Sequence, residues 1–73
     1  MPKLFSSSHI FKILRACGFD FISQRGSHAK FRKSGKPVLT VIVPAGKKQI
    51  PQGTFRSILR QSNLAKEDFI KKK

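Results

Sequence analysis

The chain has 73 residues, with sixteen Lys and Arg against three Asp and Glu, and a formal net charge of +13 at pH 7. This length fits one domain, residues 1–73, with a thin core and no room for a large cofactor cavity, so we expect no cofactor. The charge exceeds the value of about 2–8 that keeps a small domain soluble, and it predicts a polyanionic partner, above all a nucleic acid.

The composition also argues against membrane, disulfide and metal chemistry. The longest apolar run, residues 38–43, is far shorter than the ~20 residues of a spanning helix, and the first six residues lack a signal-peptide core. The single cysteine, Cys17, excludes an internal disulfide, so we expect a cytoplasmic protein. The few acids and histidines are too scattered to predict a magnesium or zinc site.

The first half of the chain predicts one helix followed by two strands. Helical spacing of apolar residues predicts a helix over 6–17, with a serine cap at its start and Gly18 just past its end. Residues 19–24 predict a strand whose facing is uncertain, because both of its sides are partly apolar. A glycine turn at 25–27 leads into a second strand over 28–33.

The second strand alternates clearly between apolar and polar residues. Ala29 and Phe31 are predicted to face the core, and His28, Lys30 and Arg32 to line the opposite, solvated face. After a turn at 34–37, an apolar strand is predicted over 38–43 and is expected to sit centrally or well covered. A loop at 45–52 leads to a helix that begins at 53 or 54, ends at 62 and stops at Asn63. The chain then forms a short turn at 65–70, held by Leu64 and Phe69, and a disordered basic tail at 71–73.

This order, α-β-β-β-α, predicts an α+β fold. The simplest packing is a three-stranded antiparallel meander with both helices on one face. The other face, which carries His28, Lys30 and Arg32, then stays open for a ligand.

His28 is the residue best suited to chemistry. Imidazole exchanges protons near neutral pH and acts as a general acid or base. RNA carries its own nucleophile, the ribose 2′-OH, so one histidine with neighbouring cations suffices for cleavage without a metal. Lys30 and Arg32 are candidates for binding the phosphate. The competing interpretation is an exposed strand histidine without a role.

The chain also contains a set of short motifs in a fixed order. They are Cys17-Gly18-Phe19, Arg25-Gly26-Ser27-His28, Val43-Pro44 and the segment from Ile50-Pro51-Gln52-Gly53 to Arg60-Gln61. In this combination the chain resembles the HicA family of mRNA-interferase toxins over nearly its whole length. The resemblance implies a fold like a double-stranded-RNA-binding domain, a catalytic role for His28, and an antitoxin partner of the HicB kind. Many members of that family carry a second histidine where this chain has Gly46.

Several other residues are weaker candidates. Lys47, Lys48, Arg56 and Arg60 would extend the phosphate-binding track if they are more than solvated charges. In the turn that supports the site, Gly26 permits the reversal of the chain. The neighbouring Ser27 cannot act as a nucleophile with His28, because adjacent strand residues point to opposite faces. His9, on the first helix, is expected to be structural or solvent-facing.

The sequence therefore predicts a metal-independent endoribonuclease toxin that cleaves mRNA through His28, blocks translation and is sequestered by an acidic antitoxin. A non-catalytic RNA-binding module of the same fold stays open as an alternative, since phosphate contacts alone give affinity. A DNA-binding regulator is the third possibility. Against this possibility, the second helix offers mainly Arg56 and Arg60 for reading bases.

Overall fold

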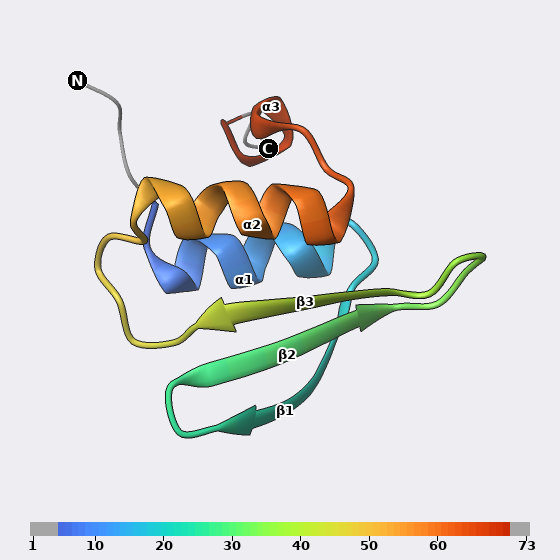
Figure 1. Cartoon of the computed structure of the whole chain (residues 1–73), viewed down its shortest axis with the longest axis horizontal. Helices are drawn as coiled ribbons and strands as arrows, with labels where there is room; N and C mark the ends of the chain where they lie inside the picture. Colours follow the sequence, from blue (N-terminus) through green and yellow to red (C-terminus); the bar gives the residue numbers. More distant parts are fainter. Residues whose placement is uncertain (1–4, 71–73) are drawn as a thin grey trace.

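Six elements follow one another along residues 5–70, the part of the chain that the computed structural model describes (Figure 1). They are α1 (Ser7–Ala16), β1 (Asp20–Arg25), β2 (His28–Lys33), β3 (Leu39–Pro44), α2 (Gln52–Ser62) and α3 (Lys66–Ile70). The predicted α+β order is confirmed, and each predicted boundary falls within one or two residues of the observed one, but the segment predicted as a short turn over 65–70 forms the helix α3. The predicted basic tail at 71–73 lies outside the described residues.

Local signals fix both ends of α1. The side chain of Ser6 accepts a hydrogen bond of 3.1 Å from the backbone N–H of His9, which is the expected N-terminal cap. The helix ends at the C-cap Cys17, and Gly18 follows with a φ of +95°, a conformation that glycine adopts without a Cβ penalty.

The sheet is a meander in the order β1-β2-β3, and both pairs are antiparallel. We expected the apolar third strand to be central or well covered; it lies at an edge, and β2 is the central strand. The α2 helix covers this edge, since the side-chain oxygen of Gln61 accepts a hydrogen bond of 2.9 Å from the backbone N–H of Ile42. The strand also includes Pro44, one residue past its predicted end at 43; as the last residue of an edge strand, proline is tolerated there.

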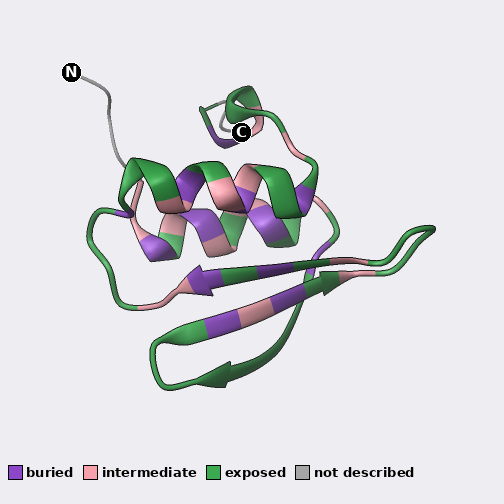
Figure 2. Cartoon of the chain, viewed as in Figure 1, coloured by how far each residue is buried: buried purple, intermediate pink, exposed green. Residues whose placement is uncertain are grey.

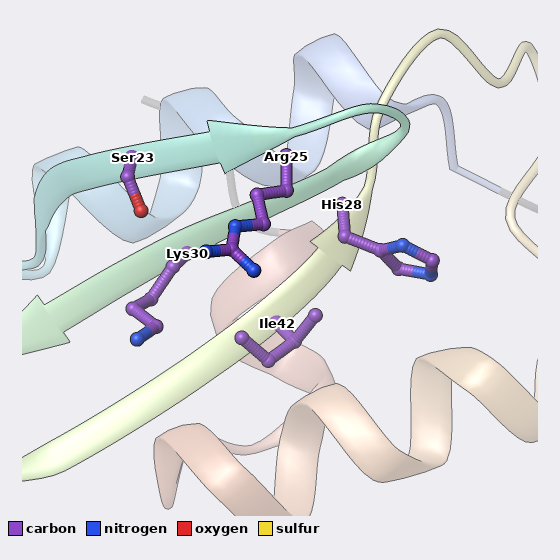
Figure 3. Close-up of a pocket in the computed structure, with 5 residues that line it drawn as sticks. All are labelled: Ser23, Arg25, His28, Lys30 and Ile42. Carbon is purple, nitrogen blue, oxygen red and sulfur yellow. The ribbon is translucent and has the colours of Figure 1, made fainter.

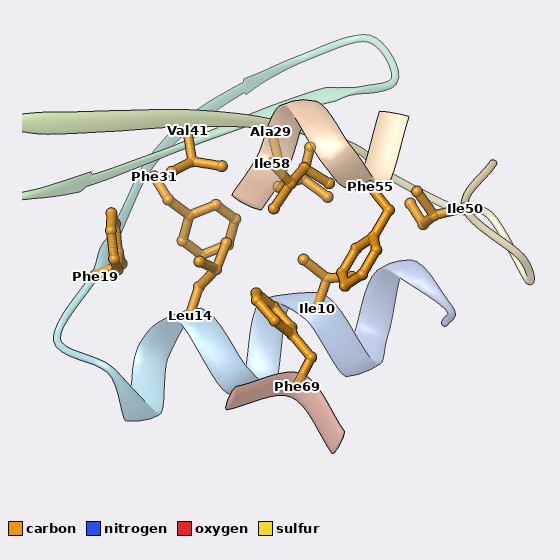
Figure 4. Close-up of a cluster of buried hydrophobic side chains, with 11 residues drawn as sticks. Ile10, Leu14, Phe19, Ala29, Phe31, Val41, Ile50, Phe55, Ile58 and Phe69 are labelled. Carbon is orange, nitrogen blue, oxygen red and sulfur yellow. The ribbon is translucent and has the colours of Figure 1, made fainter. Parts of the chain in front are cut away.

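One face of the sheet and both long helices enclose the hydrophobic core (Figure 4). Ala29 and Phe31 on β2 point into it as predicted, and Figure 2 shows the buried positions alternating along β2 and β3. The buried apolar residues are Ile10, Leu14, Phe19, Ala29, Phe31, Val41, Val43, Ile50, Phe55, Ile58 and Phe69. Because the helices use only this face, the opposite face of the sheet is free.

The short α3 helix closes the core from the far side of the helices. Phe69 is fully buried and meets Phe55 edge-on, with 5.3 Å between ring centroids. His9 holds the same helix, because its Nε2 lies 2.7 Å from the carbonyl oxygen of Phe69 while its ring stacks on Phe5. These contacts agree with the structural role that the sequence suggested for His9.

A β-bulge in β1 explains why its facing was uncertain from the sequence. Phe21 pairs with Phe31 and Ser23 pairs with Lys30, so Ile22 has no partner on β2. The extra residue shifts the alternation by one position between Phe21 and Ser23. A strict period of two, which the sequence pattern assumed, therefore fails at this point.

Candidate functional site

The free face of the sheet carries three rows of side chains that the strand register places next to one another. The rows run across the sheet as Arg25–His28–Pro44, Ser23–Lys30–Ile42 and Asp20–Arg32–Thr40. Directly opposed residues in an antiparallel sheet have their Cβ atoms about 4.5–5.5 Å apart. The first two rows thus bring one imidazole and two cations together at the turn end of the sheet.

A hollow of about 310 Å³ opens on these two rows. It is lined by Ser23, Arg25, His28, Lys30 and Ile42, and Figure 3 shows the Arg25 and Lys30 side chains extending over the same face as the imidazole of His28. The volume lies at the small end of the range for ligand pockets, about 300–1,000 Å³. The hollow is open to solvent and positively charged, so it suits part of an anionic chain.

Hydrogen bonds brace the Gly26-Ser27 turn, which leads directly into His28. Gly26 has a φ of +56°, and the side-chain N–H of Gln24 donates to its carbonyl oxygen at 3.0 Å. From the other side, the backbone N–H of Ala45 donates to the carbonyl oxygen of Ser27 at 2.7 Å. The imidazole therefore projects from a braced turn at the start of a central strand, a rigid base for a functional group.

The hollow includes some predicted residues and leaves others outside it. His28 and Lys30 line it, but Arg32 lies one row further along β2, directly across from Asp20. The other predicted cations, Lys47, Lys48, Arg56 and Arg60, are exposed and do not line the hollow. Asp20 places a negative charge on the neighbouring strand next to Arg32, so this row is less positively charged than the two rows at the hollow.

Arg25, which lines the hollow, was predicted as part of the turn and not as a site residue. The signal was present, because a two-residue turn at Gly26-Ser27 forces Arg25 to pair with His28. Paired residues share a face of the sheet. Ile42 was missed for a different reason: it belongs to an apolar strand, where no pattern marks one residue as lying beside a histidine.

Among residues 5–70, no group of three or more His, Cys, Asp or Glu side chains is placed to hold a metal ion. Within the same range, no helix has the length and apolar character needed to cross a bilayer.

The fold and this site define a small basic α+β domain that presents a histidine and two cations on an open sheet face. The family model for the HicA toxin of bacterial toxin–antitoxin systems matches residues 7–64. The chain therefore belongs to the HicA toxin family, and membership implies an antitoxin partner. No curated protein sequence matched the chain in a separate comparison.

Proposed function

We propose that this toxin is a metal-independent endoribonuclease that cleaves mRNA and thereby blocks translation, and that an antitoxin of the HicB kind restrains it. The observation that supports this proposal best is the position of His28. Its side chain lines the same hollow as Arg25 and Lys30, so a group that can transfer a proton and two cations that can bind phosphate lie on one patch of the sheet.

In the proposed reaction the ribose 2′-oxygen attacks the adjacent phosphorus while His28 accepts the 2′-OH proton. The new P–O2′ bond forms as the P–O5′ bond breaks. The leaving 5′-oxygen takes up a proton from the imidazolium, which returns His28 to its starting state. The products are a 2′,3′-cyclic phosphate and a 5′-OH, and the reaction requires no external nucleophile.

Arg25 and Lys30 supply the electrostatic part of this mechanism. Charge builds up on the non-bridging phosphate oxygens as the phosphorus becomes five-coordinate, and fixed cations beside it lower the barrier. Arg25 lies directly across from His28, and Lys30 is two residues along the same strand on the same face. The bidentate geometry of a guanidinium makes Arg25 the better candidate for contacting two phosphate oxygens at once.

The proposal is tested by incubating a labelled single-stranded RNA with the purified chain in the presence of EDTA. The wild type should cut it and leave cyclic phosphate ends, whereas His28→Ala should bind the RNA and not cut it. Added imidazole should restore part of the activity of His28→Ala. Products with 5′-phosphate ends, or loss of wild-type cleavage in EDTA, would contradict the mechanism.

The chain offers a matched control in its other histidine. His9→Gln removes an imidazole and keeps a side-chain N–H for the carbonyl oxygen of Phe69, so it should cleave at the wild-type rate. If wild type and His28→Ala both bind RNA and neither cuts it, the non-catalytic RNA-binding module is the better description. The exposed cations of the hollow would then act in binding alone.

A further inference from the structure

One edge of the sheet is covered by a helix and the other is uncovered. Along β3, α2 lies against the edge and Gln61 occupies the outward N–H of Ile42. Along β1, all six residues are exposed, and within residues 5–70 no element pairs with the outer side of this strand. An uncovered edge presents unpaired backbone N–H and C=O groups, and natural proteins normally guard such an edge or use it for binding.

A row of aromatic rings leads from the helix layer to this open edge. Phe31 is fully buried between two other rings, with centroid distances of 5.1 Å to Phe11 on α1 and 5.6 Å to Phe21 on β1. Phe21, at the outer end of the row, is 43% exposed, and the bulged Ile22 beside it is 41% exposed. The apolar layer of the core therefore continues to the edge and stops there uncovered.

The opposite side of the same strand is polar and cationic. Ser23 and Arg25 face the hollow, where Lys30 adds a second positive charge. A strand laid along β1 would thus have two chemically distinct sides. On the helix side its residues would meet Phe21, and on the other side they would lie beside Arg25.

From this pattern we infer that β1 is a docking edge, where the antitoxin adds an extended segment to the sheet. The segment alternates apolar residues, which cover Phe21 and Ile22, with acidic residues, which approach Arg25 and Lys30. Backbone pairing of this kind supplies affinity, and the alternating side chains supply specificity. The inference rests on membership in a toxin–antitoxin family and is independent of whether His28 cleaves RNA.

Charge favours this occupant over two others. A second copy of the chain would bring two molecules of net charge +13 together, and like charges oppose such an association. A nucleic acid has no strand to pair with the edge and gains little from the apolar side that Phe21 and Ile22 present. An acidic partner with an extended apolar segment satisfies the backbone groups, the apolar row and the cations together.

The test uses the whole chain and its complex with its cognate antitoxin, purified after co-expression. Amide hydrogen exchange should slow in β1 when the complex forms. Ile22→Lys, which places on the edge the charge that natural sheets use to block pairing, should weaken the complex by roughly tenfold or more. Val38→Lys is the matched control, because Val38 is 54% exposed and lies outside β1, and its complex should keep the wild-type affinity.

Two further measurements separate a lost interface from a lost fold or function. Ile22→Lys should retain the wild-type unfolding midpoint and the wild-type affinity for a 2′-O-methyl RNA that cannot be cleaved. Unchanged exchange of the β1 amides in the complex would overturn the inference, even if the toxin cuts RNA as proposed. It would also be overturned by concentration-dependent dimers of the chain alone whose β1 amides are protected.

Discussion

The hydroxyl of Ser7, in the first turn of α1, donates a hydrogen bond of 2.6 Å to the carbonyl oxygen of Pro44, which lies 37 residues further along the chain. The same hydroxyl accepts a hydrogen bond of 2.9 Å from the backbone N–H of Lys47. In return, the carbonyl oxygen of Lys47 accepts a hydrogen bond of 2.9 Å from the backbone N–H of Ser7. Because Pro44 pairs with His28 across the sheet, these three bonds fix the strand end that lies beside the candidate site.

Replacing Ser7 by alanine should therefore destabilise the protein. Ser7 is only 3% exposed, so the substitution leaves the Lys47 N–H without its acceptor and the Pro44 carbonyl oxygen without its donor, both beside a buried position. A buried polar group left unpaired costs about 1–3 kcal/mol. Urea unfolding should show a lower midpoint for Ser7→Ala, with a free energy of unfolding reduced by this amount.

Ser8 provides the control for this measurement. It is the next residue of α1 and is exposed, so Ser8→Ala should change the free energy of unfolding by no more than about 0.5 kcal/mol. Equal midpoints for the two variants would show that the bonds of Ser7 contribute nothing net to stability.

The three serines at the start of α1, Ser6, Ser7 and Ser8, show what a sequence does and does not predict. A serine cap for α1 was predictable from the local pattern, and Ser6 supplies it. Nothing local distinguishes Ser7 from Ser8, because the partners of Ser7 are brought to it only by the tertiary fold. For the same reason the Gln61 bond at the edge of β3 was not predictable, and the sequence left open whether the third strand is central or well covered; it is an edge strand covered by α2.

Within the candidate site, the alternation of β2 was enough to place His28 and Lys30 on one face, and the structure confirms that placement. It also placed Arg32 there, without showing that Asp20 lies opposite it. Cross-strand neighbours depend on register, and in β1 the register is shifted by the bulge at Ile22. The likeness of the fold to a double-stranded-RNA-binding domain stays a prediction.

Asn63 ends α2 in the left-handed conformation, with φ +62° and ψ +25°. Asparagine tolerates this region better than other residues with a side chain, and glycine better still. Asn63→Ala should lower the free energy of unfolding by about 1 kcal/mol, whereas Asn63→Gly should leave it unchanged or raise it slightly. Thermal unfolding followed by circular dichroism measures both. A lower melting temperature for the glycine variant than for the alanine variant would contradict this reading of the cap.

The attachment of α3 should depend on one side chain. Phe69 is fully buried against Phe5 and Phe55, so Phe69→Ala should cost about 3–5 kcal/mol, most of the stability expected of so small a domain. Ile70, the next residue, is 58% exposed, and Ile70→Ala should hardly change the free energy of unfolding. Circular dichroism at 25 °C should show Phe69→Ala largely unfolded. A cooperative, wild-type-like melt for that variant would mean that α3 is dispensable for the fold.

The cations of the open face should not contribute equally to RNA affinity. Arg25→Gln, Lys30→Gln and Arg32→Gln each remove one positive charge, so their comparison holds net charge constant. Arg25 and Lys30 line the hollow, while Arg32 lies across from Asp20. Binding of a 2′-O-methyl RNA should therefore weaken by roughly tenfold for the first two variants, and less for Arg32→Gln.

Salt dependence and a reciprocal variant sharpen that comparison. Losing a phosphate contact lowers the slope of log K against log salt by about 1, so the slope should fall for Arg25→Gln and Lys30→Gln. Asp20→Asn removes the acid that pairs with Arg32 across the strands and should strengthen binding, because it takes away a negative charge that repels phosphate. If Arg32→Gln weakens binding as much as Arg25→Gln does, RNA is held along the whole of β2 and not at the hollow beside His28.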